Sequence, residues 1–192
     1  MKVIPKKFTI KIPSDIKIIY SYQKQIIIFI GPLKQKSLKL KTKLLILRNE
    51  KIIKVSDIPT SKKISNNEKK NLKSIQGTTV ALIKQLIIET STIIYQKLKF
   101  IGVGYRTSPV DKFKNKLVMF KLGYSHLIYF KIPKEIQISC LKLTKLFIFG
   151  NSYADVNQTA SLIRSYKHPE PYKGKGILYE NEKIMLKDGK KV

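Results

Sequence analysis

Acidic residues are scarce in this sequence of 192 residues, in which 12 Asp and Glu face 39 Lys and Arg and leave a formal net charge of +27. Arginine is scarce as well: only Arg48, Arg106 and Arg164 occur, so the remaining cations are lysine. So large an excess of one charge repels itself in a free globule, which indicates a polyanionic partner. Nucleic acid is the first candidate, and an anionic membrane surface is the second.

Cysteine and histidine are too few for most catalytic or metal sites. Cys140 is the single cysteine, which excludes an intramolecular disulfide and a cysteine-based zinc site, and its apolar neighbours predict a buried structural role. His126 and His168 are the only imidazoles, and no nucleophile elbow or oxyanion turn frames them. We therefore expect no enzymatic activity, no catalytic residue, no metal and no cofactor.

Long apolar runs are missing too. The densest one, residues 25–31, has the length of a strand and falls well short of the roughly 20 residues that span a membrane, so no membrane insertion is expected. Residues 1–13 alternate like a strand after Pro5 and lack the features of a secretory signal or an organellar presequence. Lys, Ile and Asn have AU-rich codons, which indicates an AT-rich genome. We expect an organelle-encoded protein, mitochondrial before plastid, with the cytoplasm of an AT-rich bacterium as the alternative.

An internal repeat predicts a duplicated architecture. Residues 12–18, IPSDIKI, are similar to residues 132–138, IPKEIQI, and each copy continues into an apolar strand that ends in glycine, at Gly31 and at Gly150. Coincidence between two strands of an isoleucine-rich chain is the alternative explanation.

Periodicity predicts the same plan in both halves of the chain. Strands are expected near residues 8–12, 15–20, 25–30, 36–40, 43–48 and 51–55, then 95–106, 116–121, 126–132, 135–140 and 145–149. A helix is expected after each set, from Leu72 to about Thr90 and over residues 152–166. The fold class is therefore α+β, with two domains, 1–92 and 93–192, each a mostly antiparallel sheet packed with one helix.

Neither glycine-rich stretch has the spacing of a nucleotide site. Gly102-Val103-Gly104 lacks the third glycine of a dinucleotide loop and is followed by residues that cannot open a helix, so we interpret it as a twist or close approach within a strand. Lys173-Gly174-Lys175-Gly176 likewise lacks the phosphate-loop pattern.

Lysines gather in the first half, at positions 34, 36, 39, 41 and 43, at Lys62-Lys63 and at Lys69-Lys70. Such a run is either a solvated face or part of a phosphate footprint. A footprint of about 6 to 10 phosphates would lose roughly 10³ to 10⁵ in affinity between 50 and 200 mM salt.

The segment PEPYKGKGILY, residues 169–179, carries the sharper signal. Its two prolines stiffen a terminal arm. Lys173 and Lys175 supply point charges for phosphates, the glycines allow backbone N–H groups to approach a polyanion, and Tyr172 offers a stacking face. The alternative is a loop whose tyrosine only packs on its own domain.

This segment resembles the C-terminal signature of the large-subunit ribosomal protein L-six family, bacterial and organellar type. Further similar motifs follow the family's order over essentially the whole chain: Gly77-Thr78-Thr79, Gly102-Val103-Gly104-Tyr105-Arg106, Gly123-Tyr124-Ser125-His126 and Leu186-Lys187-Asp188-Gly189-Lys190-Lys191. Between Leu33 and Lys73 the resemblance is loose, which leaves the partners of that segment open.

The resemblance implies a duplicated two-domain fold and a structural role in the large ribosomal subunit. It implies contacts with rRNA near the sarcin-ricin loop, with neighbouring ribosomal proteins and, transiently, with translational GTPases. Carried over by motif, the rRNA contacts are Tyr172, Lys173, Gly174, Lys175 and Gly176, then Lys187, Lys190 and Lys191, all within a terminal arm of residues 167–192. Leu178 stands where the family usually has arginine, so a bidentate or stacking contact there is left open.

Two other interpretations stay open at this point. A free-standing RNA-binding or RNA-chaperone module would use the same basic surface on many RNAs. A basic protein docking on anionic membranes fits the lysines, but the sequence shows no amphipathic helix with a strongly basic face.

Overall fold

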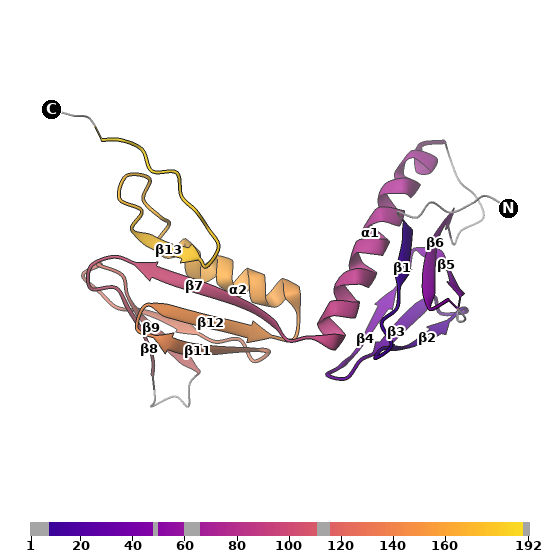
Figure 1. Ribbon diagram of the computed structural model, residues 1–192, viewed down its shortest axis with the longest axis horizontal. Coiled ribbons are helices and arrows are strands. Elements are labelled where there is room, and N and C mark those ends of the chain that lie inside the picture. The colour runs from indigo at the N-terminus through magenta and orange to yellow at the C-terminus, as the bar shows by residue number, and fades with distance from the viewer. Residues whose placement is uncertain (1–7, 48–49, 60–65, 111–115, 190–192) are drawn as a thin grey trace. The chain divides into compact units, whose positions relative to one another are not determined.

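The chain divides into two compact units, Met1–Thr92 and Ile93–Val192. The computed structural model describes residues 8–47, 50–59, 66–110 and 116–189 (Figure 1). Each unit contains two antiparallel sheets and one helix around a core of its own.

The first unit is built from short strands followed by one long helix. Its strands are β1 (Thr9–Lys11), β2 (Lys17–Ser21), β3 (Ile26–Ile30), β4 (Gln35–Lys39), β5 (Thr42–Leu47) and β6 (Ile52–Pro59), and the helix is α1 (Asn66–Ser91). The strands form two sheets with the orders β1-β6-β5 and β2-β3-β4. The helix begins earlier than the apolar periodicity predicts, because its first turns are polar.

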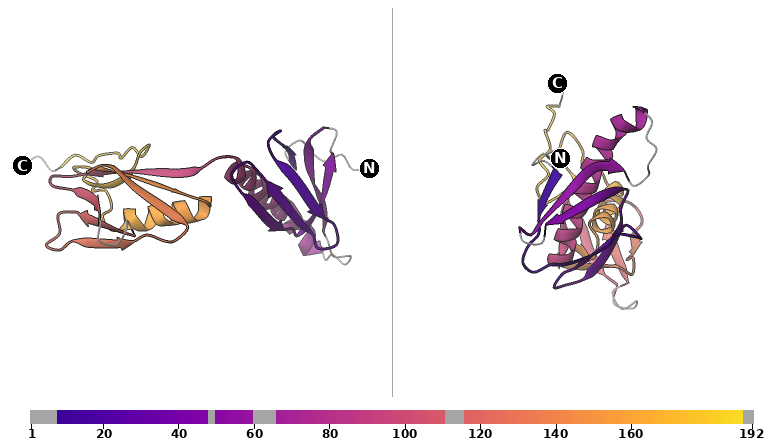
Figure 2. Two further views of the ribbon diagram at one scale, coloured as in Figure 1. Left: turned by 90° about the horizontal axis from the view of Figure 1, so that it is seen from below. Right: turned by 90° about the vertical axis from the view of Figure 1, so that its right-hand side faces the viewer.

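The second unit follows the same plan and adds a strand at its end. Its elements are β7 (Ile94–Ile101), β8 (Arg106–Pro109), β9 (Leu117–Lys121), β10 (Ile128–Lys131), β11 (Ile136–Lys142), β12 (Lys145–Gly150), α2 (Tyr153–Ser165) and β13 (Gly176–Tyr179). The sheets have the orders β10-β9-β8 and β11-β12-β7-β13, and the helix lies along the second sheet (Figure 2).

The strand orders show how the two units correspond. Sheet β1-β6-β5 matches β7-β12-β11, and sheet β2-β3-β4 matches β8-β9-β10, with antiparallel pairing throughout. In each unit the helix follows the central strand of the first of these sheets, β6 or β12. The predicted α+β class with a duplicated architecture is confirmed.

The sequence repeat that suggested the duplication does not join equivalent positions. Residues 12–18 connect β1 to β2 and begin β2, whereas residues 132–138 connect β10 to β11 and begin β11. Both segments form the same local turn: the Ile16 N–H donates to the Pro13 carbonyl (3.4 Å) and the Ile136 N–H to the Pro133 carbonyl (3.2 Å). Each turn leads into a hairpin whose second strand is apolar and runs up to or into a glycine. The similarity therefore reflects a shared turn and hairpin at non-equivalent positions, and the duplication itself is shown by the strand orders.

Helix amphipathicity explains both cores. In the first unit Val80, Ile83 and Ile87 of α1 are buried with residues of β3 and β6 such as Phe29 and Val55. In the second unit the buried stripe of α2 is Val156, Thr159, Ala160 and Ile163, and it packs with apolar residues of β7 and β12. Cys140, expected to be buried, lies half-buried at the margin of this core, where burial raises the pKa of its thiol.

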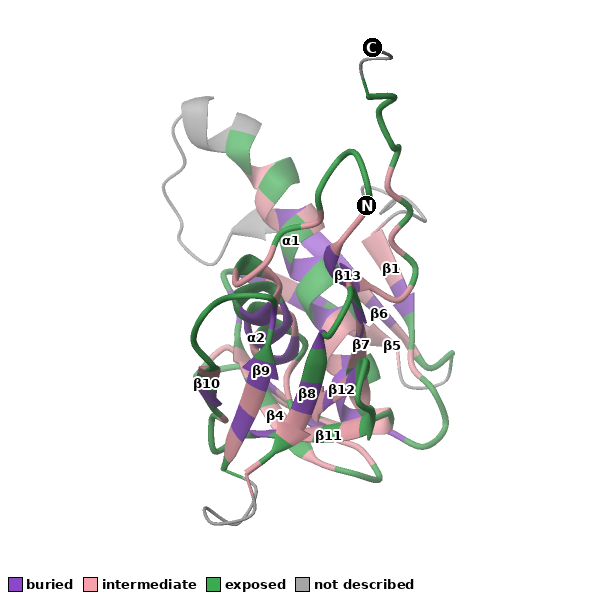
Figure 3. Ribbon diagram, turned by 90° about the vertical axis from the view of Figure 1, so that its left-hand side faces the viewer, coloured by how far each residue is buried: buried purple, intermediate pink, exposed green. Residues whose placement is uncertain are grey.

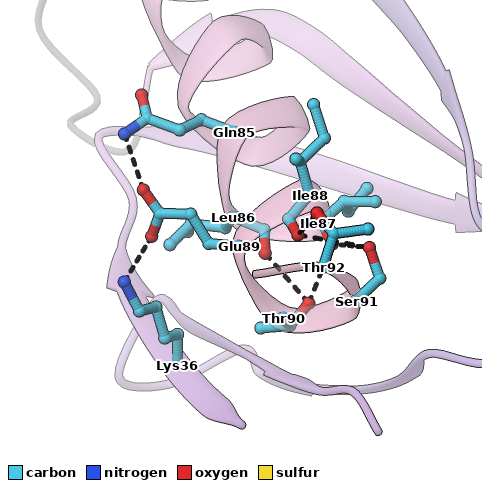
Figure 4. Close-up of polar contacts among 9 residues, drawn as sticks. All are labelled: Lys36, Gln85, Leu86, Ile87, Ile88, Glu89, Thr90, Ser91 and Thr92. Carbon is cyan, nitrogen blue, oxygen red and sulfur yellow. Dashed lines mark hydrogen bonds and ion pairs between the residues drawn. The ribbon is translucent and has the colours of Figure 1, made fainter. Parts of the chain in front are cut away.

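A buried polar cluster closes the end of α1 against β4. The Glu89 side chain is 2% exposed, forms an ion pair with the Lys36 ammonium and accepts a hydrogen bond from Gln85 Nε2 at 2.8 Å (Figure 4). Thr90 and Ser91 hydroxyls bond back to carbonyls of the preceding turn. This cluster gives Lys36 a structural role inside the first unit.

The strand expected over residues 95–106 is interrupted. β7 ends at Ile101 and β8 begins at Arg106, and the Tyr105 N–H reaches the Gly102 carbonyl at 3.4 Å. A Cβ on Gly102 would lie 2.8 Å from the Tyr105 ring, which is buried. Gly102 therefore marks a close approach under an aromatic ring, and Gly104 has a left-handed φ of +75°. The expected close approach is present, but it lies in a turn between two strands and not within one strand.

No helix in the described part of the chain is long and apolar enough to cross a membrane. Among the same residues, no cluster of three or more His, Cys, Asp or Glu side chains has the arrangement of a metal site.

Candidate nucleic-acid interface

The predicted site is a closed loop. We call residues 170–175 the terminal loop. Two backbone bonds of 2.9 Å close it, from the Glu170 N–H to the Lys175 carbonyl and from the Gly174 N–H to the Glu170 carbonyl. Tyr172 is 55% exposed and Lys173 is exposed. The loop thus holds an aromatic ring and an ammonium group in water on a fixed backbone.

The two glycines of the loop region serve different purposes. Gly174 has φ of +66°, in the left-handed region that other residues adopt at a cost, and is half-buried. Gly176 is buried: a Cβ there would lie 2.6 Å from Pro169 Cα and 2.8 Å from the His168 carbonyl oxygen. The left-handed φ of the loop therefore accounts for Gly174, whose N–H is used within the loop, while close internal packing accounts for Gly176.

The segment after the loop is a strand, which the interpretation as a terminal arm missed. β13 pairs with β7 in antiparallel register, with Ile177 opposite Phe100 and Leu178 opposite Lys99. The Ile177 N–H also donates to the Lys167 carbonyl at 2.9 Å. The apolar run after Gly176 was the available signal. Leu178 is only 6% exposed, so its side chain packs within the unit instead of reaching outward.

The chain then returns to the terminal loop. The Lys187 N–H donates to the Pro171 carbonyl at 2.9 Å, and Leu186 lies close to Gly174. Lys187 is exposed, as is most of the chain after β13 (Figure 3). The structure therefore brings Lys187 to Tyr172 and Lys173. Lys190 and Lys191 lie outside the described residues.

An ion pair ties this region to α2. Arg164 Nε donates to Glu182 Oε2 at 3.1 Å, the same carboxylate accepts the Tyr179 N–H at 3.1 Å, and the guanidinium lies 5.5 Å from the Tyr179 ring centroid. The hydrogen bond from Arg164 holds the pKa of Glu182 below its usual value. Arg164 therefore anchors β13 and the segment that follows it.

Comparison with known proteins identifies the fold and its loop. The family model described as "Ribosomal protein L6" matches residues 101–180, which include the terminal loop. A large ribosomal subunit protein uL6 from Mycoplasmoides gallisepticum is 35% identical over 181 residues, 94% of this chain and 92% of the relative. The chain belongs to the ribosomal protein L6 family. The uL6 protein of Chlorobium limicola is 43% identical over 124 residues, 65% of this chain and 67% of its own, and that of Buchnera aphidicola is 44% identical over 115 residues, 60% and 63%.

L6 proteins are structural components of the ribosome and not enzymes. Membership of this family confirms the resemblance drawn from the sequence and the expectation of a protein without catalytic activity.

In this L6 chain a second group of side chains lies near the end of α2, with Tyr124 and His126 exposed and Lys167 half-buried. The Tyr124 hydroxyl donates to the Tyr166 carbonyl at 3.0 Å, Lys167 Nζ lies 4.5 Å from the Tyr124 ring centroid, and His126 stacks on the same ring at 5.8 Å. His126 is exposed beside this tyrosine and lysine. Because Lys167 also bonds to β13, this group is continuous with the terminal loop region.

The lysines of the first unit differ in exposure and in whether they pair with an acid. Lys36 is paired with Glu89, whereas Lys39 and Lys41 are exposed. Burial, with the nearby Lys36 charge, lowers the pKa of Lys34. Lys62 and Lys63 lie outside the described residues, and the side chains of Lys69 and Lys70 are not described.

Proposed function

We propose that this protein, a structural component of the large ribosomal subunit, contacts large-subunit rRNA through the terminal loop and the strand-anchored segment behind it. The observation that carries the proposal is the closed loop that presents Tyr172 and Lys173 in water beside Lys187. Lysine neutralises phosphate, and a fixed tyrosine ring stacks on a base or hydrogen-bonds a phosphate.

The rRNA-contact set is Tyr172, Lys173, Gly174, Lys175 and Lys187, with Lys190 and Lys191 following in the sequence and with Gly176 as the position that fixes the loop from below. Lys175 is half-buried, and its carbonyl closes the loop. Its side chain is thus the more restricted of the two loop lysines.

The proposed target is the rRNA near the sarcin-ricin loop, where translational GTPases dock. The family resemblance of PEPYKGKGILY supports this location, and the formal charge of +27 supports an RNA partner. Neighbouring ribosomal proteins complete the environment of the subunit.

A binding experiment tests the loop. The double variant Lys173→Ala/Lys175→Ala and the charge-matched control Lys131→Ala/Lys134→Ala, both on exposed or half-exposed lysines, are titrated against an rRNA fragment containing the sarcin-ricin loop at several salt concentrations. We expect the loop variant to bind more weakly and to lower the salt slope by about one for each lost phosphate contact, with a smaller change in the control. Equal slopes in the loop variant and the wild type would place the loop away from RNA.

The docking proposal has its own measurement. Large subunits carrying the loop variant are expected to stimulate a translational GTPase less than wild-type subunits at equal occupancy. Unchanged stimulation would remove the GTPase part and leave the rRNA contact untouched.

We place the protein in a mitochondrial ribosome, with a plastid or an AT-rich bacterium as alternatives. The support is compositional: the cations are almost all lysine, and Lys, Ile and Asn have AU-rich codons. The relatives named above are bacterial. Fractionation of source cells decides the point, since enrichment with mitochondria is expected and enrichment in another compartment would reject it.

A further inference from the structure

In the second unit, the face of the larger sheet that is turned away from α2 is partly exposed. Tyr95, Lys142 and Lys145 are exposed there and Lys99, Phe147 and Phe149 are half-buried, whereas Leu178 of β13, opposite Lys99, is buried. In sheet β11-β12-β7-β13, residues such as Leu98, Leu146 and Ile148 point into the core with α2. The alternate residues point to the opposite face, since side chains alternate along a strand. We call this the open sheet face, defined by Tyr95, Phe147, Phe149, Lys99, Lys142 and Lys145.

Three aromatic rings form a row on the open sheet face. Tyr95 and Phe149 are cross-strand partners, Tyr95 stacks on Phe147 with ring centroids 5.2 Å apart, and Phe147 lies 5.5 Å from Phe149. Tyr95 is 55% exposed. Phe147 and Phe149 are half-buried. Contiguous aromatic rings that reach the surface of a sheet offer a stacking platform to bases.

Lysines occupy directly opposite positions beside these rings. Lys99 faces Lys145 across the β7–β12 pair, and a register shift in β11 after Cys140 brings Lys142 opposite Lys145. Like charges in directly opposed positions destabilise a sheet unless an anion lies between them. Lys145 is two residues from Phe147 along β12, about 7 Å, so a nucleotide stacked on the ring brings its phosphate within reach of the lysine.

The only acid in contact with this region, among the described residues, is Glu180. Its carboxylate pairs with Lys97 at 3.2 Å, and its carbonyl accepts a hydrogen bond from Lys99 Nζ at 2.9 Å. The open sheet face therefore keeps a positive balance, which complements a polyanion.

The corresponding sheet of the first unit shows that the fold does not require such rings. Strands β1, β5 and β6 have the sequences TIK, TKLLIL and IIKVSDIP, without an aromatic residue. The two units share topology and differ in this face. The aromatic row is thus a property of the second unit and not of the architecture.

We propose that the open sheet face binds a single-stranded segment of RNA, with one or two bases stacked on Tyr95, Phe147 and Phe149 and their phosphates beside Lys99, Lys142 and Lys145. A duplex hides its base faces, so the occupant is unpaired. Lysine is depleted in the cores of protein interfaces, which favours RNA over a protein partner. The proposal rests on the ribosomal function above and adds a second contact, built from different residues than the terminal loop.

Binding of a labelled 12-nucleotide oligouridine and of a 12-base-pair RNA duplex to the full chain at 150 mM salt tests the proposal. Tyr95→Leu/Phe149→Leu keeps apolar bulk and removes the π faces. Tyr129→Leu is the matched control, because Tyr129 on β10 is 56% exposed and belongs to the other sheet. We expect the double variant to lose roughly 5- to 100-fold in affinity for oligouridine, with the duplex and the control unchanged within about twofold.

Photo-crosslinking supplies a direct second readout. Oligouridine containing 5-iodouridine is expected to crosslink to Tyr95, Phe147 or Phe149. Wild-type affinity in the double variant, or crosslinks that all fall on other elements, would overturn the proposal. If the double variant binds oligouridine normally but is no longer incorporated into the large ribosomal subunit, the proposal is overturned as well, in favour of a protein partner at this face.

The contact of the terminal loop with rRNA is tested by a separate experiment. Oligouridine carries no sarcin-ricin structure, so a failure of Lys173→Ala/Lys175→Ala to weaken binding of the rRNA fragment counts against the loop and leaves the open sheet face standing. Urea unfolding of each variant checks that the fold is retained.

Discussion

At the scale of single residues, Glu89 shows how this strongly basic chain uses one of its few acids. The carboxylate is 2% exposed and is held by Lys36 and Gln85 at the end of α1. A buried charge is tolerated when it is paired and hydrogen-bonded, and it becomes costly when a partner is removed.

Glu89→Gln is expected to destabilise the first unit by about 1–3 kcal/mol, because Lys36 then loses its counter-charge in a half-buried site. Hydrogen exchange of amides in the last turns of α1 measures the change. Lys36→Met/Glu89→Leu removes both charges and is expected to recover much of the loss. Wild-type protection in the single variant would show that the pair contributes nothing.

Glu182 is the acid with a pH-dependent role. Its pKa is lowered in the folded chain, first by the hydrogen bond from Arg164. A carboxylate with a depressed pKa stabilises the fold above its unfolded value, about 4.3, and the contribution is lost as pH falls through the folded pKa.

The attachment of residues 179–182 to α2 is therefore expected to loosen below about pH 4.3, with no change between pH 6 and 8. Amide protection at Tyr179, whose N–H bonds to the same carboxylate, measures it by NMR. Glu182→Gln is expected to flatten this pH dependence. A loosening that persists unchanged in this variant would assign the effect to other groups.

At the scale of elements, β13 decides how the terminal loop is presented. The loop is held at one end by pairing of β13 with β7 and at the other by α2, so it is displayed from a sheet and not from a free arm. Gly176 is the position where this arrangement is tightest.

Gly176→Val is expected to detach β13, since the new side chain collides with the backbone of Pro169 and His168. Gly189→Val is the matched control, because nothing lies within 4 Å of a Cβ there. Limited proteolysis after residue 166 and binding of the rRNA fragment report the change: faster cleavage and weaker binding in the first variant only. Equal cleavage in both variants would refute the packing argument.

At the scale of the whole molecule, the net positive charge is the property that most affects RNA binding. With +27 formal charges, release of counterions makes RNA binding strongly salt-dependent. A stable ribosomal component still differs from a module that binds many RNAs, because shape and several simultaneous contacts retain it on one particle.

The protein is expected to co-sediment with the large ribosomal subunit in a sucrose gradient of native lysate, in moderate and in high salt. Its appearance at the top of the gradient in both conditions would favour the free-standing RNA-binding module. Anionic vesicles at physiological salt serve as the control for a membrane surface, and flotation with them would reopen that alternative.

The sequence by itself determined what depends on neighbours along the chain. Helix periodicity, proline turns and glycine positions are local, so both helices and most strands were predicted close to where they lie. Composition determined the charge, and hence the class of partner. The same local logic misled where distant contacts decide: similar turns at residues 12–18 and 132–138 occupy different places in the two units, the strand expected over 95–106 is broken by a turn, and β13 was missed.

Only the tertiary structure decided what depends on residues far apart in sequence. Lys99 and Glu180 are 81 positions apart, yet they meet because β13 pairs with β7. The same pairing buries Leu178, assigns Gly176 to internal packing and gives Arg164 its anchoring role. The sequence does not distinguish Lys36 from the other lysines, and only the fold shows that it pairs with Glu89 of α1. Register and burial arise from the whole fold, so no local pattern specifies them.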